Sequence, residues 1–148
     1  MRSMIDFRKG LPEETFAAGA CLLEEGHKSG VLYILAEGSV EVLKGDFQIN
    51  TVAEPGALFG EVSALLGLPH MATVKALEPS RFFVVRDPDT FLRSHPDIAL
   101  GLSKLLARRL HYVTTYLVDL KNQFESRDDH LGMVDEVLES LVHHQEDD

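Results

Sequence analysis

The sequence predicts a mainly β fold with α: an antiparallel, jelly-roll-like β-roll followed by a long C-terminal dimerisation helix. Short runs rich in β-branched and aromatic residues recur through the first two-thirds of the chain, separated by Gly or Pro turns. These runs do not alternate with helices, which favours an antiparallel sandwich or barrel. Beyond Arg86 the apolar residues take up helical spacing instead.

The β part predicts six strands in order, each bounded by turn residues. They are expected at 21–26, 30–38, 39–45, 47–53, 72–78 and 81–86. Gly45-Asp46 is typical of a tight hairpin turn between the third and fourth strands. Cys21 is expected to be a small core residue of the first strand. Before the fifth strand a short apolar run predicts a brief helix, which Pro69 should end.

The helical part begins with Asp87-Pro88, a capping residue followed by proline, and this predicts the start of a short helix. Pro96 then opens a long one. Along it, apolar residues alternate in steps of four and three, which is the a/d seam of a coiled coil. The seam residues are Leu106, Leu110, Val113, Leu117, Leu120 and Phe124, and the register continues through Leu131, Val134, Leu138 and Leu141 with Arg127 as its interruption.

A small β body offers little surface to cover such a seam, so the sequence predicts a parallel homodimer through the long helix. The alternative is that the seam packs on its own β body. The predicted division is therefore a β-roll over residues 1–95 and a dimerisation helix or coiled coil with an acidic tail over 96–145.

Composition excludes several classes of function. The 148 residues carry a net charge of −10, and residues 125–148 hold nine acids against one arginine. Such a chain repels phosphate backbones, so no nucleic-acid partner is expected. No apolar run approaches the roughly 18 residues of a membrane span. A single cysteine rules out an internal disulfide and agrees with a cytoplasmic protein.

Enzymatic motifs are also missing from the sequence. It contains no phosphate loop, no Gly-x-Ser-x-Gly and no Cys/His cluster with metal-ligand spacing. We therefore expect no catalytic residues, no metal site and no enzyme activity.

Three stretches in order resemble a known family. They are "FAAGACLLEEGHKSGVLYILAEGSVEVLK", "EPGALFGEVSALLGLPHMATVKA" and "HPDIALGLSKLLARRL". Together, over residues 12–115, they resemble the cyclic-nucleotide-binding domain, and more narrowly the sensor half of the bacterial catabolite activator protein and Fnr family. The DNA-binding domain of those transcription factors has no counterpart in the acidic segment after Phe124.

The resemblance implies a ligand site for a cyclic nucleotide (cAMP or cGMP) or another small anion. Its implied residues are Phe59, Gly60, Glu61, Val62, Ser63, His70, Met71, Ala72, Thr114 and Thr115. Gly60 would allow the backbone to approach the phosphate at a helix N-terminus. Glu61 would accept a hydrogen bond from the ribose 2′-OH, or would simply be an acid in the first helical turn. The two threonines would reach the base, or would face solvent beside the seam.

Position 70 departs from the family pattern, which has arginine after the proline. His70 is shorter and is largely neutral at pH 7, because its ordinary pKa is roughly 6.5. A lost charged hydrogen bond to phosphate costs on the order of 1.5–3 kcal/mol. Met71 stands where the family favours a small residue, and its long side chain is expected to fill part of the phosphate pocket. Weak or altered ligand binding is the expectation.

Two functions remain open from the sequence. The first is a regulatory sensor that couples ligand binding to the dimer helix. The second is a ligand-independent, dimeric interaction module on a degenerate cyclic-nucleotide-binding scaffold, whose C-terminal segment docks a partner protein.

Overall fold

The computed structural model describes residues 11–123 and 128–143, with the side chains of the last stretch described from 132 to 142. The strands are β1 (Glu13–Phe16), β2 (Cys21–Leu23), β3 (Leu32–Glu37), β4 (Val40–Lys44), β5 (Phe47–Val52), β6 (Leu58–Phe59), β7 (Thr73–Ala76) and β8 (Ser80–Val85). The helices are α2 (Glu61–Leu66), α3 (Pro88–Ser94), α4 (Pro96–Gln123) and α5 (Asp128–His143).

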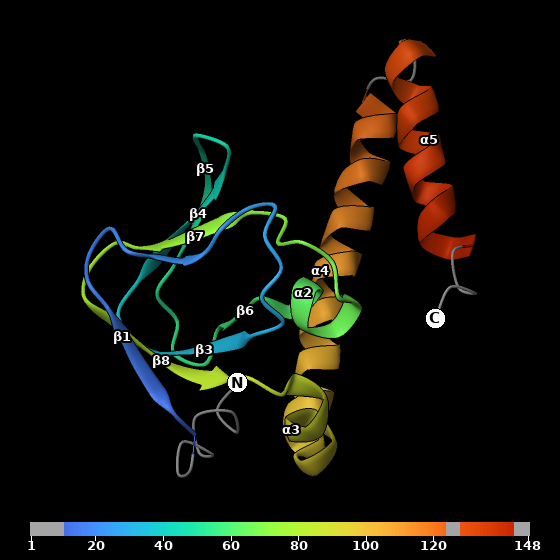
Figure 1. Ribbon diagram of the computed structural model, residues 1–148. Coiled ribbons are helices and arrows are strands. Elements are labelled where there is room, and N and C mark those ends of the chain that lie inside the picture. The colour runs from blue at the N-terminus through green and yellow to red at the C-terminus, as the bar shows by residue number, and fades with distance from the viewer. Residues whose placement is uncertain (1–10, 124–127, 144–148) are drawn as a thin grey trace. The chain divides into compact units, whose positions relative to one another are not determined.

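The strands form two four-stranded antiparallel sheets, in the orders β1-β8-β3-β6 and β2-β7-β4-β5 (Figure 1). Both orders join strands that are far apart in sequence, as a jelly-roll-like β-roll requires. Apolar side chains from the two sheets share one buried cluster, as expected for packed antiparallel sheets. The predicted antiparallel β-roll followed by a long helix is therefore confirmed.

All six predicted strands are present; the first five are shorter than predicted, and the last is shifted by one residue. The hairpin is also confirmed, because Lys44 pairs with Phe47 and leaves Gly45-Asp46 as a two-residue turn. The sequence did not predict β1, which contains two exposed or half-buried glutamates, or β6, which is only two residues long. Neither segment carries enough alternation to be recognised as a strand.

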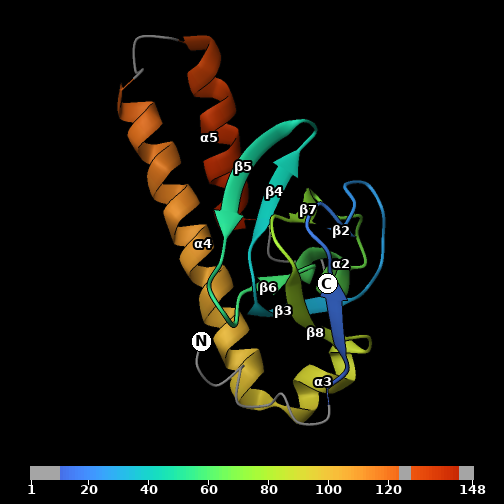
Figure 2. The same cartoon turned by 90° about the vertical axis from the view of Figure 1, so that its left-hand side faces the viewer.

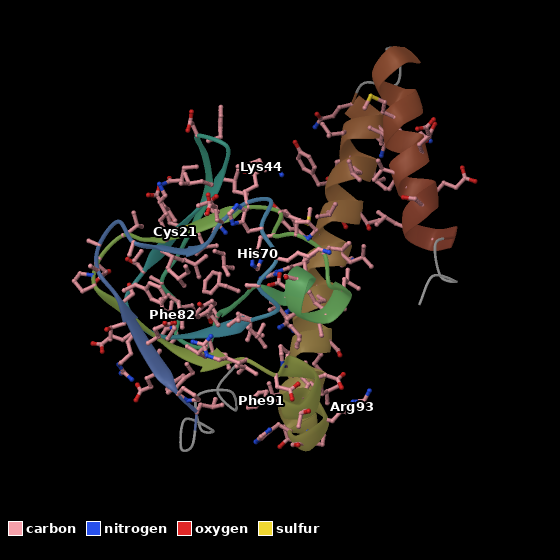
Figure 3. The ribbon with its side chains drawn as sticks, viewed as in Figure 1. Cys21, Lys44, His70, Phe82, Phe91 and Arg93 are labelled. Carbon is pink, nitrogen blue, oxygen red and sulfur yellow. The ribbon has the colours of Figure 1, made fainter. Side chains whose placement is uncertain are left out.

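Phe82 lies at the centre of the core (Figure 3). Its ring meets those of Phe16, Tyr33 and Phe59 edge to face, with centroids 5.6, 6.0 and 6.2 Å away. This geometry is favoured because the positive edge of one ring meets the negative face of another. The cluster joins β1, β3, β6 and β8, so it fixes the end of β6 from which α2 departs.

Cys21 does not belong to this core, and that prediction is wrong. It lies in β2 but is exposed, whereas Leu22 and Leu23 are both buried. The strand pairing shifts register between Cys21 and Leu23, which breaks the simple alternation of inward and outward side chains.

The short helix α3 begins as the sequence predicts. The Asp87 carboxylate accepts a hydrogen bond from the Thr90 N–H at 3.3 Å, and Pro88 occupies the first turn. The chain then divides into two compact units, Met1–Ala99 and Leu100–Asp148. The predicted functional division at residue 95 stays a prediction.

In the second unit α4 and α5 are separate helices, and α5 turns back beside α4 (Figure 2). An ion pair between Lys121 and Asp135 joins them. The sequence left open whether the helix continues past Arg127; the heptad register is in fact divided between two helices, since Val134 and Leu138 lie on α5. The described seam ends at Leu120; Phe124, Arg127 and the side chain of Leu131 lie outside the described residues. Among the residues described, no helix has the length and apolar character to cross a membrane.

Gly60 sets how closely α2 approaches the β3 end of the roll. Its φ of 90° lies in the left-handed region, and a Cβ added there would lie 2.4 Å from the Val31 carbonyl oxygen. Gly67, at the other end of α2, also has a positive φ of 68°, but an added Cβ would meet nothing within 4 Å. At both positions any other residue would have a strained backbone, but only at Gly60 would an added Cβ collide with another part of the chain.

We expect Gly67→Ala to lower the free energy of unfolding by about 1–2 kcal/mol, the usual cost of left-handed backbone in an alanine. Gly60→Ala should cost clearly more, because a backbone carbonyl cannot move aside as a side chain does. Chemical denaturation of both variants measures this difference. Equal losses would contradict the close approach at Val31.

Candidate functional site

The candidate site forms where α2 meets the loop between β2 and β3. The helix starts after Gly60, whose carbonyl accepts the Ala64 N–H at 2.9 Å. It ends at Gly67, whose N–H donates to the Ser63 carbonyl at 3.0 Å in a left-handed cap. The predicted short helix is confirmed, but Gly67 ends it and not Pro69.

Ser63 attaches this loop to the helix. Its side chain is only 3% exposed, and its Oγ accepts hydrogen bonds from the Ser29 N–H at 3.2 Å and the Gly30 N–H at 3.1 Å. A hydroxyl oxygen has two lone pairs, so both are used by these two amides. The loop backbone is thereby held against α2 by a side chain of the helix itself.

His70 makes the second attachment (Figure 3). It is 5% exposed, and its Nε2 lies 2.8 Å from Ser29 Oγ. The backbone N–H of His70 donates to the His27 carbonyl at 2.8 Å, and the backbone carbonyl of His70 accepts the Gly26 N–H at 2.9 Å. We call Ser29, Ser63 and His70, with these bonds to residues 26–30, the His70 clasp.

The charge state of His70 follows from its surroundings. Burial lowers the pKa of the ring, the Glu61 carboxylate acts in the opposite direction, and His27 adds to the lowering. A histidine whose folded pKa lies below its ordinary value stabilises the fold in its neutral form. That contribution is fully present above the ordinary pKa and is lost as the pH falls from there through the lower pKa of the folded protein. The ring therefore brings no full positive charge to the site near pH 7.

Met71 lies beside the clasp with its side chain turned outward, 66% exposed. Its carbonyl accepts a hydrogen bond from Lys44 Nζ at 2.8 Å, and Lys44 also pairs with Glu25 at 3.0 Å. The positive charge of Lys44 is therefore paired with the Glu25 carboxylate. An exposed Met71 fills less of a phosphate pocket than the sequence suggested.

The other predicted residues divide into two groups. Phe59 is buried in the aromatic core, while Glu61, Val62 and Ala72 are half-buried around α2 and the start of β7. Glu61 stands in the first turn of α2. Thr114 is half-buried and Thr115 is exposed, and both lie on α4 in the second compact unit. The candidate site is thus built from the first unit, and the part of the threonines stays a prediction.

Sequence reasoning missed the contribution of Ser29. In the sequence, the segment "EEGHKSG" shows only two turn-forming glycines, Gly26 and Gly30. Its serine hydroxyl meets the His70 ring across 41 positions of sequence, a contact that no local pattern reveals. Within the part of the chain that the structure describes, no group of three or more His, Cys, Asp or Glu side chains could hold a metal ion.

Comparison with solved structures places this arrangement among known folds. Thermus thermophilus catabolite activator protein aligns with a TM-score of 0.68 at 24% identity, covering 81% of this chain and 58% of that one. The N-terminal domain of a Streptomyces coelicolor transcriptional regulator aligns with a TM-score of 0.56 at 29% identity, covering 75% and 81%. These likenesses agree with the β-roll and the helix that follows it.

Sequence relatives match a shorter part of the chain. The cAMP-dependent protein kinase regulatory subunit of Yarrowia lipolytica is 31% identical over 71 residues, which is 48% of this chain and 19% of that protein. An ABC transporter ATP-binding protein of Mycobacterium tuberculosis is 37% identical over 71 residues, 44% of this chain and 22% of its own length. The chain thus spans about a fifth of these relatives.

The family model for the cyclic nucleotide-binding domain matches residues 13–92. The match runs from β1 through α3 and includes α2, Ser63, His70 and the loop that they hold. Because it covers more than half of the chain, it establishes the family of the β-roll and of the candidate site together. The chain belongs to the cyclic nucleotide-binding domain family.

Proposed function

We propose that the chain is a regulatory sensor that binds a cyclic nucleotide, or a related small anion, weakly at α2 and the His70 clasp. The family match over residues 13–92, which spans the whole candidate site, is the observation that carries this proposal. The Yarrowia relative is named for dependence on cAMP, and one structural neighbour is titled cAMP-bound. Another, with a TM-score of 0.64, comes from work titled on a cyclic-GMP-dependent pathway.

The ligand would meet three kinds of group. The Cβ position of Gly60 lies against the Val31 carbonyl oxygen, so a phosphate would be met by the backbone N–H groups of the first turn of α2 instead. The carboxylate of Glu61 is suited to accept a hydrogen bond from a ribose hydroxyl. Neutral His70 leaves the phosphate charge without a full counter-charge at this position, which accounts for weak binding.

Occupancy of the site would act on a dimer formed through α4. The seam residues Leu110 and Val113 are 47% and 46% exposed in the single chain. Exposed apolar side chains in a/d spacing lose water contact when two helices pair, which favours a second copy as their partner. Catabolite activator protein supplies a precedent in fold for a β-roll followed by such a helix.

A second function is favoured by a different observation. The apolar residues Leu66, Leu68 and Met71 are all exposed on or just after α2. An apolar surface of this kind suits protein contact. In this alternative the β-roll is a ligand-independent scaffold that docks a partner, with the acidic C-terminal segment as a further contact. No catalytic step belongs to either function.

His70→Arg tests the charge argument. We expect wild-type protein to bind cAMP and cGMP weakly, and the variant to bind 10- to 150-fold more tightly, the equivalent of about 1.5–3 kcal/mol for a charged hydrogen bond. Isothermal titration calorimetry measures both. His27→Arg is the matched control, because it adds the same charge at an exposed neighbouring residue. Submicromolar binding by the wild type would show that His70 is no handicap, and failure of both proteins to bind would favour the scaffold.

Leu117→Asp tests the dimer. A buried carboxylate at a seam position should dissociate the pair, because an unpaired charge is costly to bury. Val118→Asp is the control, since it adds the same charge one residue away, off the seam. Sedimentation equilibrium at tens of micromolar should find a dimer for the wild type and for the control, and a monomer for Leu117→Asp. A wild-type monomer would refute pairing through α4.

A further inference from the structure

The direction in which the Ser29 hydroxyl points depends on which nitrogens of the His70 ring carry a proton. Ser29 Oγ lies 2.8 Å from His70 Nε2 and also accepts the Val31 N–H at 3.3 Å. A serine hydroxyl has one proton to donate and two lone pairs. The Val31 N–H uses one lone pair of Ser29 Oγ. The hydroxyl proton and the second lone pair are left, and one of them faces the His70 ring while the other faces solvent or a ligand.

Three states of the ring divide them differently. With the ring neutral and its proton on Nε2, Nε2–H donates to Ser29 Oγ, but the ring brings no positive charge to a ligand. With the ring neutral and its proton on Nδ1, Nε2 accepts, and the Ser29 O–H must point at it. With the ring protonated, Nε2–H donates, and Ser29 Oγ then accepts from both Val31 and His70. The hydroxyl proton of Ser29, which is an exposed residue, is then directed away from the ring and can be donated to a ligand.

The charged groups around the ring permit this change. Glu61 on α2 favours the protonated ring, while His27 on the loop and burial oppose it. Lys44, from the β4 strand, is bonded to the Met71 carbonyl and paired with Glu25, so its charge is already balanced. The balance favours a neutral ring in the free protein, and a negative charge added beside Ser29 would shift it toward the protonated ring.

We propose that binding of a cyclic nucleotide at the His70 clasp draws one proton from solvent onto His70, and that Ser29 becomes a direct hydrogen-bond donor to the ligand phosphate. This inference rests on the proposed function. The imidazolium supplies the counter-charge that arginine supplies in the family pattern, but only with a proton from the medium. Affinity is therefore tied to pH, and the site responds to the ligand and to acidity together.

The change of affinity with pH has an upper limit when binding takes up a single proton. When binding takes up one proton, the dissociation constant rises by at most tenfold for each pH unit above the range where the free ring titrates. Between pH 6 and pH 8 the wild-type affinity should therefore fall, by at most about a hundredfold. If the ring stays neutral and binding takes up no proton, His70 gives the affinity no such dependence on pH.

The experiment is calorimetric titration of cAMP and of cGMP into the full chain at pH 6, 7 and 8, each in two buffers of different ionisation enthalpy. The change of observed enthalpy with buffer enthalpy counts the protons taken up. We expect an uptake above zero and up to one for the wild type. His70→Gln keeps a neutral partner for Ser29 and should abolish both the uptake and the pH slope. His27→Gln removes a neighbouring exposed histidine and should keep both.

Ser29 is tested by a pair of variants. Ser29→Ala should weaken binding more at pH 6 than at pH 8, because the donated hydroxyl matters once the ring is protonated, and Ser29→Thr should restore it. Thermal unfolding of each variant without ligand confirms that it is folded. Equal weakening at both pH values would remove Ser29 from the ligand contact.

The results separate this inference from the proposed function. Wild-type binding without proton uptake, or uptake that persists in His70→Gln, overturns the inference and leaves the sensor in place. Binding by His70→Arg alone, with no wild-type binding at pH 6, overturns both the inference and the proposed function for the native chain and favours the scaffold. If neither protein binds either nucleotide at any pH, both the inference and the proposed function fall.

Discussion

A buried serine hydroxyl holds the candidate site together. Ser63 Oγ accepts the N–H groups of Ser29 and Gly30, and both of its lone pairs are used. Gly60 then lies where a Cβ would strike the Val31 carbonyl, so the chain between β2 and β3 meets α2 both at Ser63 and at Gly60. A hydrogen bond of this kind contributes about 0.5–1.5 kcal/mol net, so the two together favour the loop in its place on α2.

His70 extends the same attachment and changes what the site can recognise. Its ring and both of its backbone groups bind the loop, so the residue that follows Pro69 is committed to the interior. A neutral, buried imidazole stabilises the free site, whereas arginine would instead present a permanent charge to a ligand. In the proposed function the departure from the family pattern is therefore more than a weakened contact, because it would link ligand, proton and loop in one cluster.

Much of the fold could be predicted because turn spacing and alternation are local properties. The hairpin at Gly45-Asp46 and the capped start at Asp87 depend on residues next to each other in sequence. The return of α5 along α4 was not predictable, since heptad spacing continues across the break and does not encode direction. In the site, Glu61 and His70 could be found from motif order. Ser29 could not, because its partner lies 41 positions away.

Amide hydrogen exchange in the free protein tests the central claim, that the His70 clasp orders the loop without any ligand. The amides of Ser29 and Gly30 should be protected in the wild type, because each donates to Ser63 Oγ. In Ser63→Ala their protection should be lost, while the amide of Phe83 in the core strand β8 stays protected. Exchange of the Ser29 and Gly30 amides at the rate of an open chain in the wild type would contradict the account.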